Sequence, residues 1–142
     1  MSQENEQKKD FLKSYNKAKM KIWRLEEELE ELRQNKISPS IINDGMPHAS
    51  NVSDLSGYAA KVDEIERNIM RQRYLCVCTF QDVRGHIDAM TEEREKVLLT
   101  YRYLRGMKWE DICVKMDYSW KHMHRIHADA LKNFSLEQDD IE

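Results

Sequence analysis

Apolar residues recur in alternating steps of four and three over the first quarter of the chain. They are Phe11, Tyr15, Ala18, Ile22, Leu25, Leu29 and Leu32. Such steps keep the apolar side chains on one stripe of a helix, which is the pattern of a coiled-coil seam. The pattern therefore predicts one long helix over about residues 8–35.

A second stripe of this kind follows and continues towards Met90. Its members are Leu55, Tyr58, Val62, Ile65, Ile69, Gln72, Cys76, Phe80, Val83, Ile87 and Met90. It predicts a helix over about residues 54–90, with Ser53 as its N-cap and Gly85 as the place for a joint. Residues 36–53 lose the periodicity and contain both prolines, so a loop is expected there. Residues 1–90 are thus predicted to be a helical interaction region.

Charge is segregated along the first of these helices. Lysine and arginine dominate its first half, and the run EEELEE begins at Glu26. We interpret both runs as solvated helix faces, with contact between the basic half and nucleic acid or an acidic partner as the alternative. An intrachain hairpin would set EEELEE beside the acidic start of the second helix, whereas two antiparallel copies of the first helix would set basic on acidic residues. The charges therefore favour a homo-oligomer formed through helices 8–35 and 54–90.

Three shorter helices are predicted after the second stripe. Thr91 suits the N-cap of the first, and Gly106 suits a left-handed stop at its end. The second runs from Trp109 to Met116. After the turn Asp117-Tyr118, Ser119 is expected to cap the third.

The apolar positions of these three helices define one predicted core. They are Val97, Leu98, Tyr101, Leu104, Ile112, Cys113, Met116, Met123, Ile126, Ala130 and Leu131. Two helices joined by a short turn and packed in this way are typical of a helix-turn-helix. The sequence therefore predicts an all-α protein, with a helix-turn-helix domain over residues 91–135 and an acidic tail over residues 136–142.

The last helix carries basic and polar side chains on the face that points away from this core. In a helix-turn-helix, such a helix lies in the major groove and its first turns read base edges. Lysine and arginine donate to guanine and to phosphates, and the free amides at a helix start hold a phosphate. The residues predicted to contact double-stranded DNA are Lys108, Ser119, Trp120, Lys121, His122, His124, Arg125 and Lys132.

The segment TEEREKVLLTYRYLRGMKWEDICVKMDYSWKHMHRIHADAL, from Thr91 to Leu131, resembles region 4 of bacterial sigma factors, the part that reads promoter DNA. The matching positions are Glu95, Leu98, Tyr101, Arg102, Tyr103, Gly106, Trp109, Glu110, Ile112, Ser119, Ile126, Ala130 and Leu131. Asp117 stands where that family usually has Gly. Over about residues 45–132 the chain is similar to small phage-encoded regulators of the RinA/ArpU type. The resemblance implies a sequence-specific transcriptional regulator, phage or prophage derived, for which RNA polymerase is a candidate partner.

Composition limits how strongly this domain can bind DNA alone. The chain has a net charge of −3, so any attraction to DNA must come from local charge. Residues 91–134 hold nine lysines and arginines against seven carboxylates. Non-specific binding by such a module is about 10⁻⁴–10⁻⁶ M, and specific recognition needs about 10⁻⁸ M or better. We therefore expect a second contribution to the affinity for DNA, either from oligomerisation or from docking on RNA polymerase.

Other kinds of site are not favoured by the residue patterns. No nucleophile–base set, phosphate loop or carboxylate pair is recognisable, so neither enzymatic activity nor a cofactor is expected. Cys76 and Cys78 fall on different faces of one helix, and among His122, His124 and His127 only the last two are one turn apart, so no metal site is expected. No apolar run has the length of a membrane span, and we expect a cytoplasmic protein.

Two alternatives to a transcriptional regulator stay open. A phage DNA-packaging protein similar to a small terminase subunit also joins a helix-turn-helix to oligomerising helices. A coiled-coil adaptor would use the C-terminal helices for protein contacts and would not bind DNA. A ring-like oligomer favours the first alternative, and a lack of duplex binding favours the second.

Overall fold

The computed structural model describes residues 2–37 and 51–137. The described residues form helices and the turns between them, and they contain no strand, so the protein is all-α as predicted. The chain divides into two compact units. We call residues 19–75 the hairpin unit, and residues 1–18 together with 76–142 the head unit.

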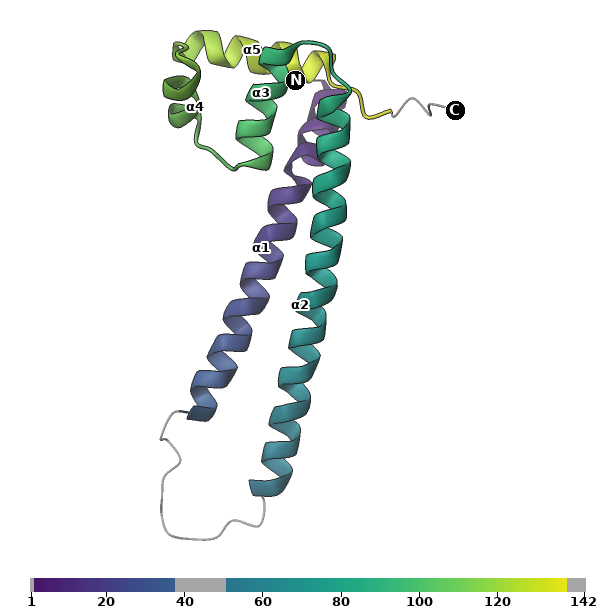
Figure 1. Ribbon diagram of the computed structural model, residues 1–142, viewed down its shortest axis with the longest axis vertical. Coiled ribbons are helices and arrows are strands. Elements are labelled where there is room, and N and C mark those ends of the chain that lie inside the picture. Colours follow the sequence, from purple (N-terminus) through teal and green to yellow (C-terminus); the bar gives the residue numbers. More distant parts are fainter. Residues whose placement is uncertain (1, 38–50, 138–142) are drawn as a thin grey trace. The chain divides into compact units, whose positions relative to one another are not determined.

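In the hairpin unit, α1 (Gln3–Ile37) and α2 (Asn51–Asp88) run antiparallel, side by side (Figure 1). Four buried aliphatic side chains, Leu25 and Leu29 of α1 with Ile65 and Ile69 of α2, form the core between them. The two long apolar stripes thus meet within one chain.

The charge argument against an intrachain hairpin is therefore wrong. Cross-helix ion pairs join Arg33 to Glu66 and Arg73 to Glu26, the second with an Nη2–Oε1 distance of 2.6 Å. Exposed charges contribute only tenths of a kcal/mol each, whereas burying an aliphatic side chain contributes about 1.5–3 kcal/mol. The apolar contacts decide the pairing, and the side-chain register then brings opposite charges together locally.

Several helix boundaries differ from the predicted ones. α1 continues to Ile37 and α2 begins at Asn51, so Ser53 lies inside α2 and is not its N-cap. The centre of the predicted loop, residues 38–50, lies outside the described residues, as do residues 138–142 of the predicted acidic tail. α2 also continues through Gly85, so no joint forms there. The next helix has Glu92 at its N-cap position instead of Thr91.

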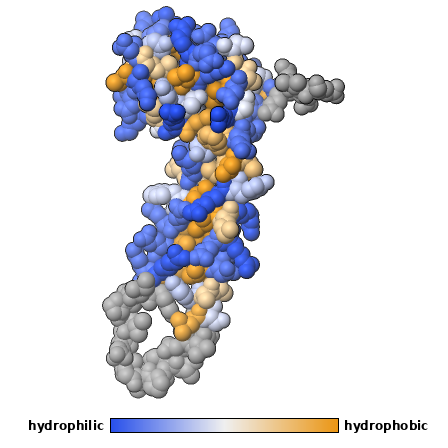
Figure 2. All heavy atoms as spheres, viewed as in Figure 1, coloured by the Kyte–Doolittle hydropathy of each residue, from blue (hydrophilic) through white to orange (hydrophobic). Residues whose placement is uncertain are grey.

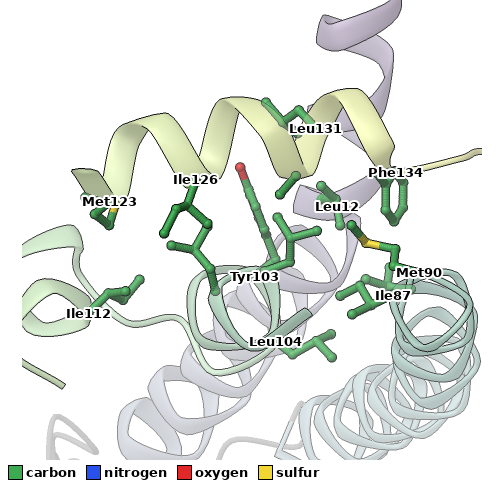
Figure 3. Close-up of a cluster of buried hydrophobic side chains, with 14 residues drawn as sticks. Leu12, Ile87, Met90, Tyr103, Leu104, Ile112, Met123, Ile126, Leu131 and Phe134 are labelled. Atoms are coloured by element: carbon green, nitrogen blue, oxygen red, sulfur yellow. The ribbon is translucent and has the colours of Figure 1, made fainter. Parts of the chain in front are cut away.

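The core of the head unit draws on every helix that the structure describes. α3 (Glu93–Leu99), η1 (Thr100–Leu104), α4 (Trp109–Met116) and α5 (Trp120–Asn133) contribute most of it. Leu12 of α1, Val83 and Ile87 of α2, and Met90, which follows α2, complete it. Figure 3 shows Leu12, Ile87 and Met90 beside Leu131 and Phe134. The predicted boundary at residue 91 therefore separates side chains that share one core.

A π-helical turn, η1, changes which residues face this core. The backbone N–H of Arg105 donates to the carbonyl of Thr100, five residues earlier, at 3.0 Å. This wider turn shifts the helical register by about one residue. Beyond the turn, Tyr103 is buried in addition to the predicted Leu104. In α3, before the turn, the predicted stripe is wrong at Val97, which is exposed, and Leu99 is buried in addition to the predicted Leu98.

Two of the described residues adopt left-handed backbone conformations at the turns. Gly106, with φ of 67°, follows η1 as predicted. Asp117, with φ of 57° and ψ of 47°, ends α4. This conformation is unfavourable by about 1–2 kcal/mol for a residue with a Cβ atom, whereas glycine adopts it without strain.

We expect opposite changes in stability at these two turns. Gly106→Ala should lower the free energy of unfolding by about 1 kcal/mol, because the new Cβ would meet no atom within 4 Å and only the backbone is strained. Asp117→Gly should raise it by about 0.5–1 kcal/mol. Urea denaturation of both variants measures these changes. Two changes of the same sign would contradict the assigned turn geometry.

Candidate nucleic-acid interface

The first turn of α5 is held by local capping and by the core. Ser119 has an extended backbone, and its Oγ accepts a hydrogen bond from the backbone N–H of His122 at 3.2 Å. Behind the helix, Met123 packs with Ile112 of α4, and both are fully buried. The predicted cap and the predicted inward face of α5 are both confirmed. The outer face of α5 therefore has a fixed orientation relative to α4.

Most of the predicted DNA contacts lie on the surface of the head unit. Lys108, Ser119, Trp120, Lys121, Arg125 and Lys132 are exposed, whereas His122 and His124 are half-buried. Lys121, Arg125 and Lys132 share one stripe, because residues four and eleven positions apart lie close together around a helix. Within the described part of the chain, the side chains of Lys121 and Arg125 have no hydrogen-bond or ion-pair partner. This stripe therefore presents the donors of Lys121 and Arg125 to solvent.

The two predicted histidines are packed against aromatic rings. His124 lies between Trp120 and Trp109, with ring centroids 4.5 and 5.3 Å away. His122 meets the ring of Tyr118 edge-on at 4.6 Å. Both rings therefore support the edges of α5 and are less available than Lys121 and Arg125 for contacts with bases.

A third histidine ties α5 to the π-helical turn. His127 Nε2 lies 2.8 Å from the hydroxyl of Tyr103, and its ring packs edge-on against Trp109. Burial, together with the nearby charges of Lys9, His124, Arg102 and Lys13, lowers the pKa of His127 to about 4. Burial also raises the pKa of Tyr103 to about 12. At neutral pH both groups are uncharged and can share one hydrogen bond inside the domain.

This arrangement predicts a loss of stability in mild acid. Below the ordinary histidine pKa of 6.5, the unfolded chain binds a proton at residue 127 that the folded chain does not bind until about pH 4. Stability should therefore fall as pH decreases through this window, by up to about 1.4 kcal/mol per pH unit. His127→Gln should reduce that slope when unfolding free energies are measured between pH 7 and pH 4. Equal slopes for the two proteins would exclude a buried neutral His127.

The end of α5 is anchored by the first turns of α1. Lys8 is buried, and its Nζ donates to the carbonyls of Leu131 at 2.9 Å and Lys132 at 3.4 Å. Nearby, the side-chain amide of Asn133 donates to both carboxylate oxygens of the buried Glu95, at 2.7 and 3.1 Å. The interpretation of the N-terminal lysines as a solvated face is therefore wrong for Lys8. Its only signal in the sequence is that it lies one turn before Leu12, on the same side of α1.

The described residues show neither a metal-binding group nor a membrane-spanning helix. In the part of the chain that the structure describes, no three histidine, cysteine or acidic side chains are grouped so as to hold a metal ion. Cys76 is buried and Cys78 is exposed, as expected for different faces of α2. None of the described helices is both long enough and apolar enough to cross a membrane.

Comparison of the chain with protein-family models, with curated proteins and with solved structures yields no match.

Proposed function

We propose that the protein binds double-stranded DNA through the outer face of α5 and acts as a sequence-specific transcriptional regulator. One observation carries the proposal. Lys121 and Arg125 share an exposed stripe of a helix whose opposite face is packed and whose first turn is capped, and neither side chain has a hydrogen-bond or ion-pair partner among the described residues. A surface that served only for packing within the chain has no use for such donors.

The dimensions and chemistry of this face suit the major groove. In a helix-turn-helix, α4 would cross the DNA backbone and α5 would enter the groove. Arg125 has the fork of donors that matches the O6 and N7 atoms of guanine, and one such pair discriminates between bases by about 1–3 kcal/mol. Lys121 can act in the same way, while Lys108 and Lys132 are placed for phosphates. Trp120, half exposed at the start of α5, can pack on a sugar or a thymine methyl group.

The regulatory role rests on the resemblance of residues 91–131 to sigma region 4. We infer that the helical N-terminal part supplies a partner, either RNA polymerase or a second copy, because residues 91–134 have only a slight excess of basic over acidic side chains. A cytoplasmic protein of phage or prophage origin is the setting that this resemblance implies. The packaging alternative needs a ring of subunits, and the adaptor alternative needs α5 to bind protein.

Selection of duplexes from a random pool tests the proposal. The full chain is expected to enrich a short motif of a few base pairs at low salt, with affinity that falls as salt rises. Binding of duplexes without enrichment of any motif would contradict sequence-specific recognition, but it would still support DNA binding. No retention of any duplex would exclude DNA binding and favour the adaptor.

A further inference from the structure

The first turns of α1 lie along one edge of α5. Lys8 donates to the carbonyl of Leu131, and Leu12, one turn after Lys8, packs in the same core as Leu131. On α5, His127 lies one turn before Leu131, and His124 lies two turns before it, on the same side of the helix. This side of α5 therefore faces α1, and we call it the α1 edge.

Cations gather beside the α1 edge. Burial is the main cause of the low pKa of His127. The charges of Lys9 and Lys13 on α1 lower this pKa further, as does the charge of Arg102 on η1, so these cations lie near His127. The guanidinium carbon of Arg102 lies 4.3 Å from the ring centroid of Trp109, and this ring also packs against His127. Cations of α1 and η1 thus flank α5 on one side.

The part of α1 that follows its first turns is basic. Residues 11–24 hold five cations and no carboxylate. Two of these cations, Lys13 and Lys17, belong to the head unit and are exposed. They lie one turn apart on one stripe of α1, and neither has a hydrogen-bond or ion-pair partner among the described residues. Lys9, in contrast, is paired with Glu6 at 3.9 Å, so Lys13 and Lys17 are the cations available to a partner.

The two edges of α5 differ in charge. Figure 2 shows that the visible face of the head unit is mainly hydrophilic. Asp129 is exposed and lies about 140° around α5 from His124, on the edge away from α1. Asn133, one turn after Asp129, donates to the carboxylate of Glu95. A phosphate strand along the α1 edge would meet unpaired cations, whereas a strand along the opposite edge would meet Asp129.

We propose that Lys13 and Lys17 bind the phosphate backbone of duplex DNA along the α1 edge, on the strand that flanks the groove read by α5. This inference rests on the proposed DNA-binding function. It adds a second DNA-binding element and a direction, because the duplex then extends towards α1 and away from Asp129. Lysine binds a phosphate as a point charge, and each such contact releases counterions from DNA. Part of the affinity that residues 91–134 lack therefore comes from α1 of the same chain.

The placement of α1 beside α5 is tested without DNA. Nuclear magnetic resonance follows the titration of His127 in the full chain and in the Lys13→Gln variant. Because a nearby cation disfavours the protonated imidazole, loss of Lys13 should raise the pKa of His127. The control Lys61→Gln, on the exposed surface of α2, should leave this pKa unchanged. If loss of Lys13 does not raise it, this lysine lies away from α5 and the proposal is overturned.

The salt dependence of DNA binding tests the phosphate contacts themselves. Fluorescence anisotropy of the full chain is measured with a duplex that it selects and with an unrelated duplex of equal length. Lys13→Gln/Lys17→Gln should lower the affinity for both duplexes about tenfold at low salt. It should also reduce the slope of log affinity against log salt by about 2, since each phosphate contact contributes about 0.9. The preference for the selected duplex should change less than about twofold, because phosphates carry no sequence information.

The matched control removes two cations from the hairpin unit. Lys61 and Arg67 of α2 are both exposed, and Lys61→Gln/Arg67→Gln should leave the affinity and the salt slope nearly unchanged. Equal effects of the two double variants would overturn this proposal but not the proposed function. DNA binding whose salt slope does not respond to Lys13→Gln/Lys17→Gln would do the same. If the unaltered chain binds no duplex at low salt, the proposed function fails and this proposal fails with it.

Discussion

Replacing Lys121 and Arg125 together with alanine is expected to weaken binding of duplex DNA about a hundredfold at low salt. Each side chain can make a contact worth about 1–3 kcal/mol, and a factor of ten in affinity corresponds to about 1.4 kcal/mol. Both side chains are exposed and lack internal partners among the described residues, so thermal unfolding should not change. Fluorescence anisotropy with a duplex selected by the full chain measures the affinity.

The matched control removes the same charges elsewhere in the head unit. Arg84 and Lys96 are paired with Asp88 and Glu93, and Arg84→Ala/Lys96→Ala removes one arginine and one lysine without touching α5. This variant should bind DNA within about threefold of the unaltered chain. If both double variants lose affinity equally, the attraction comes from net charge and α5 does not read DNA.

Leu12→Ala should lower the free energy of unfolding by about 2–5 kcal/mol, the range for large-to-small changes in a packed core. Leu12 is fully buried, and it packs in the head core although it belongs to α1, far away in the sequence. The control is Leu55→Ala, because Leu55 is half exposed and its replacement should cost no more than about 0.5 kcal/mol. Urea denaturation measures both. Equal effects would mean that the first turns of α1 do not belong to the head core.

The same packing predicts the behaviour of an isolated C-terminal fragment. A chain that starts at Thr91 lacks Leu12, Val83, Ile87 and Met90, which cover one side of the head core. We expect such a fragment to show little cooperative unfolding by circular dichroism. Two-state unfolding as sharp as that of the full chain would contradict the shared core.

The local signals in the sequence predicted much of the head unit correctly. Ser119 caps α5 through its own side chain, and Gly106 adopts the left-handed stop. The inward face of α5, including Met123 and Ala130, follows from spacing alone. These features depend on residues within one or two helical turns of each other. The periodicity of apolar residues and the chemistry of the capping residues are therefore enough to predict them.

The features that the sequence did not reveal depend on distant contacts. The heptad stripe passes through Phe11 and Tyr15, yet the fully buried residue of this segment is Leu12, because the start of α1 packs on the head unit instead of on a coiled-coil partner. Lys8 became an anchor for α5 only because the carbonyls of Leu131 and Lys132 lie beside it. The π-helical turn left no recognisable signal in the spacing of apolar residues.

Charge patterning along α1 was a poor guide to how the two long helices pair. The segregation along α1 did not prevent the hairpin, since four aliphatic side chains decide that pairing. The register that these side chains set brings Arg73 beside Glu26 and Arg33 beside Glu66.

Photocrosslinking from α5 is the most direct test of the central claim that this helix lies on DNA bases. A photoreactive amino acid at position 121 should crosslink to bases of a bound selected duplex, and the same group at position 84, on the exposed part of α2, should not. Crosslinks to a base from position 121 alone are the predicted result. A stable protein–DNA complex with no crosslink from position 121 would contradict the account.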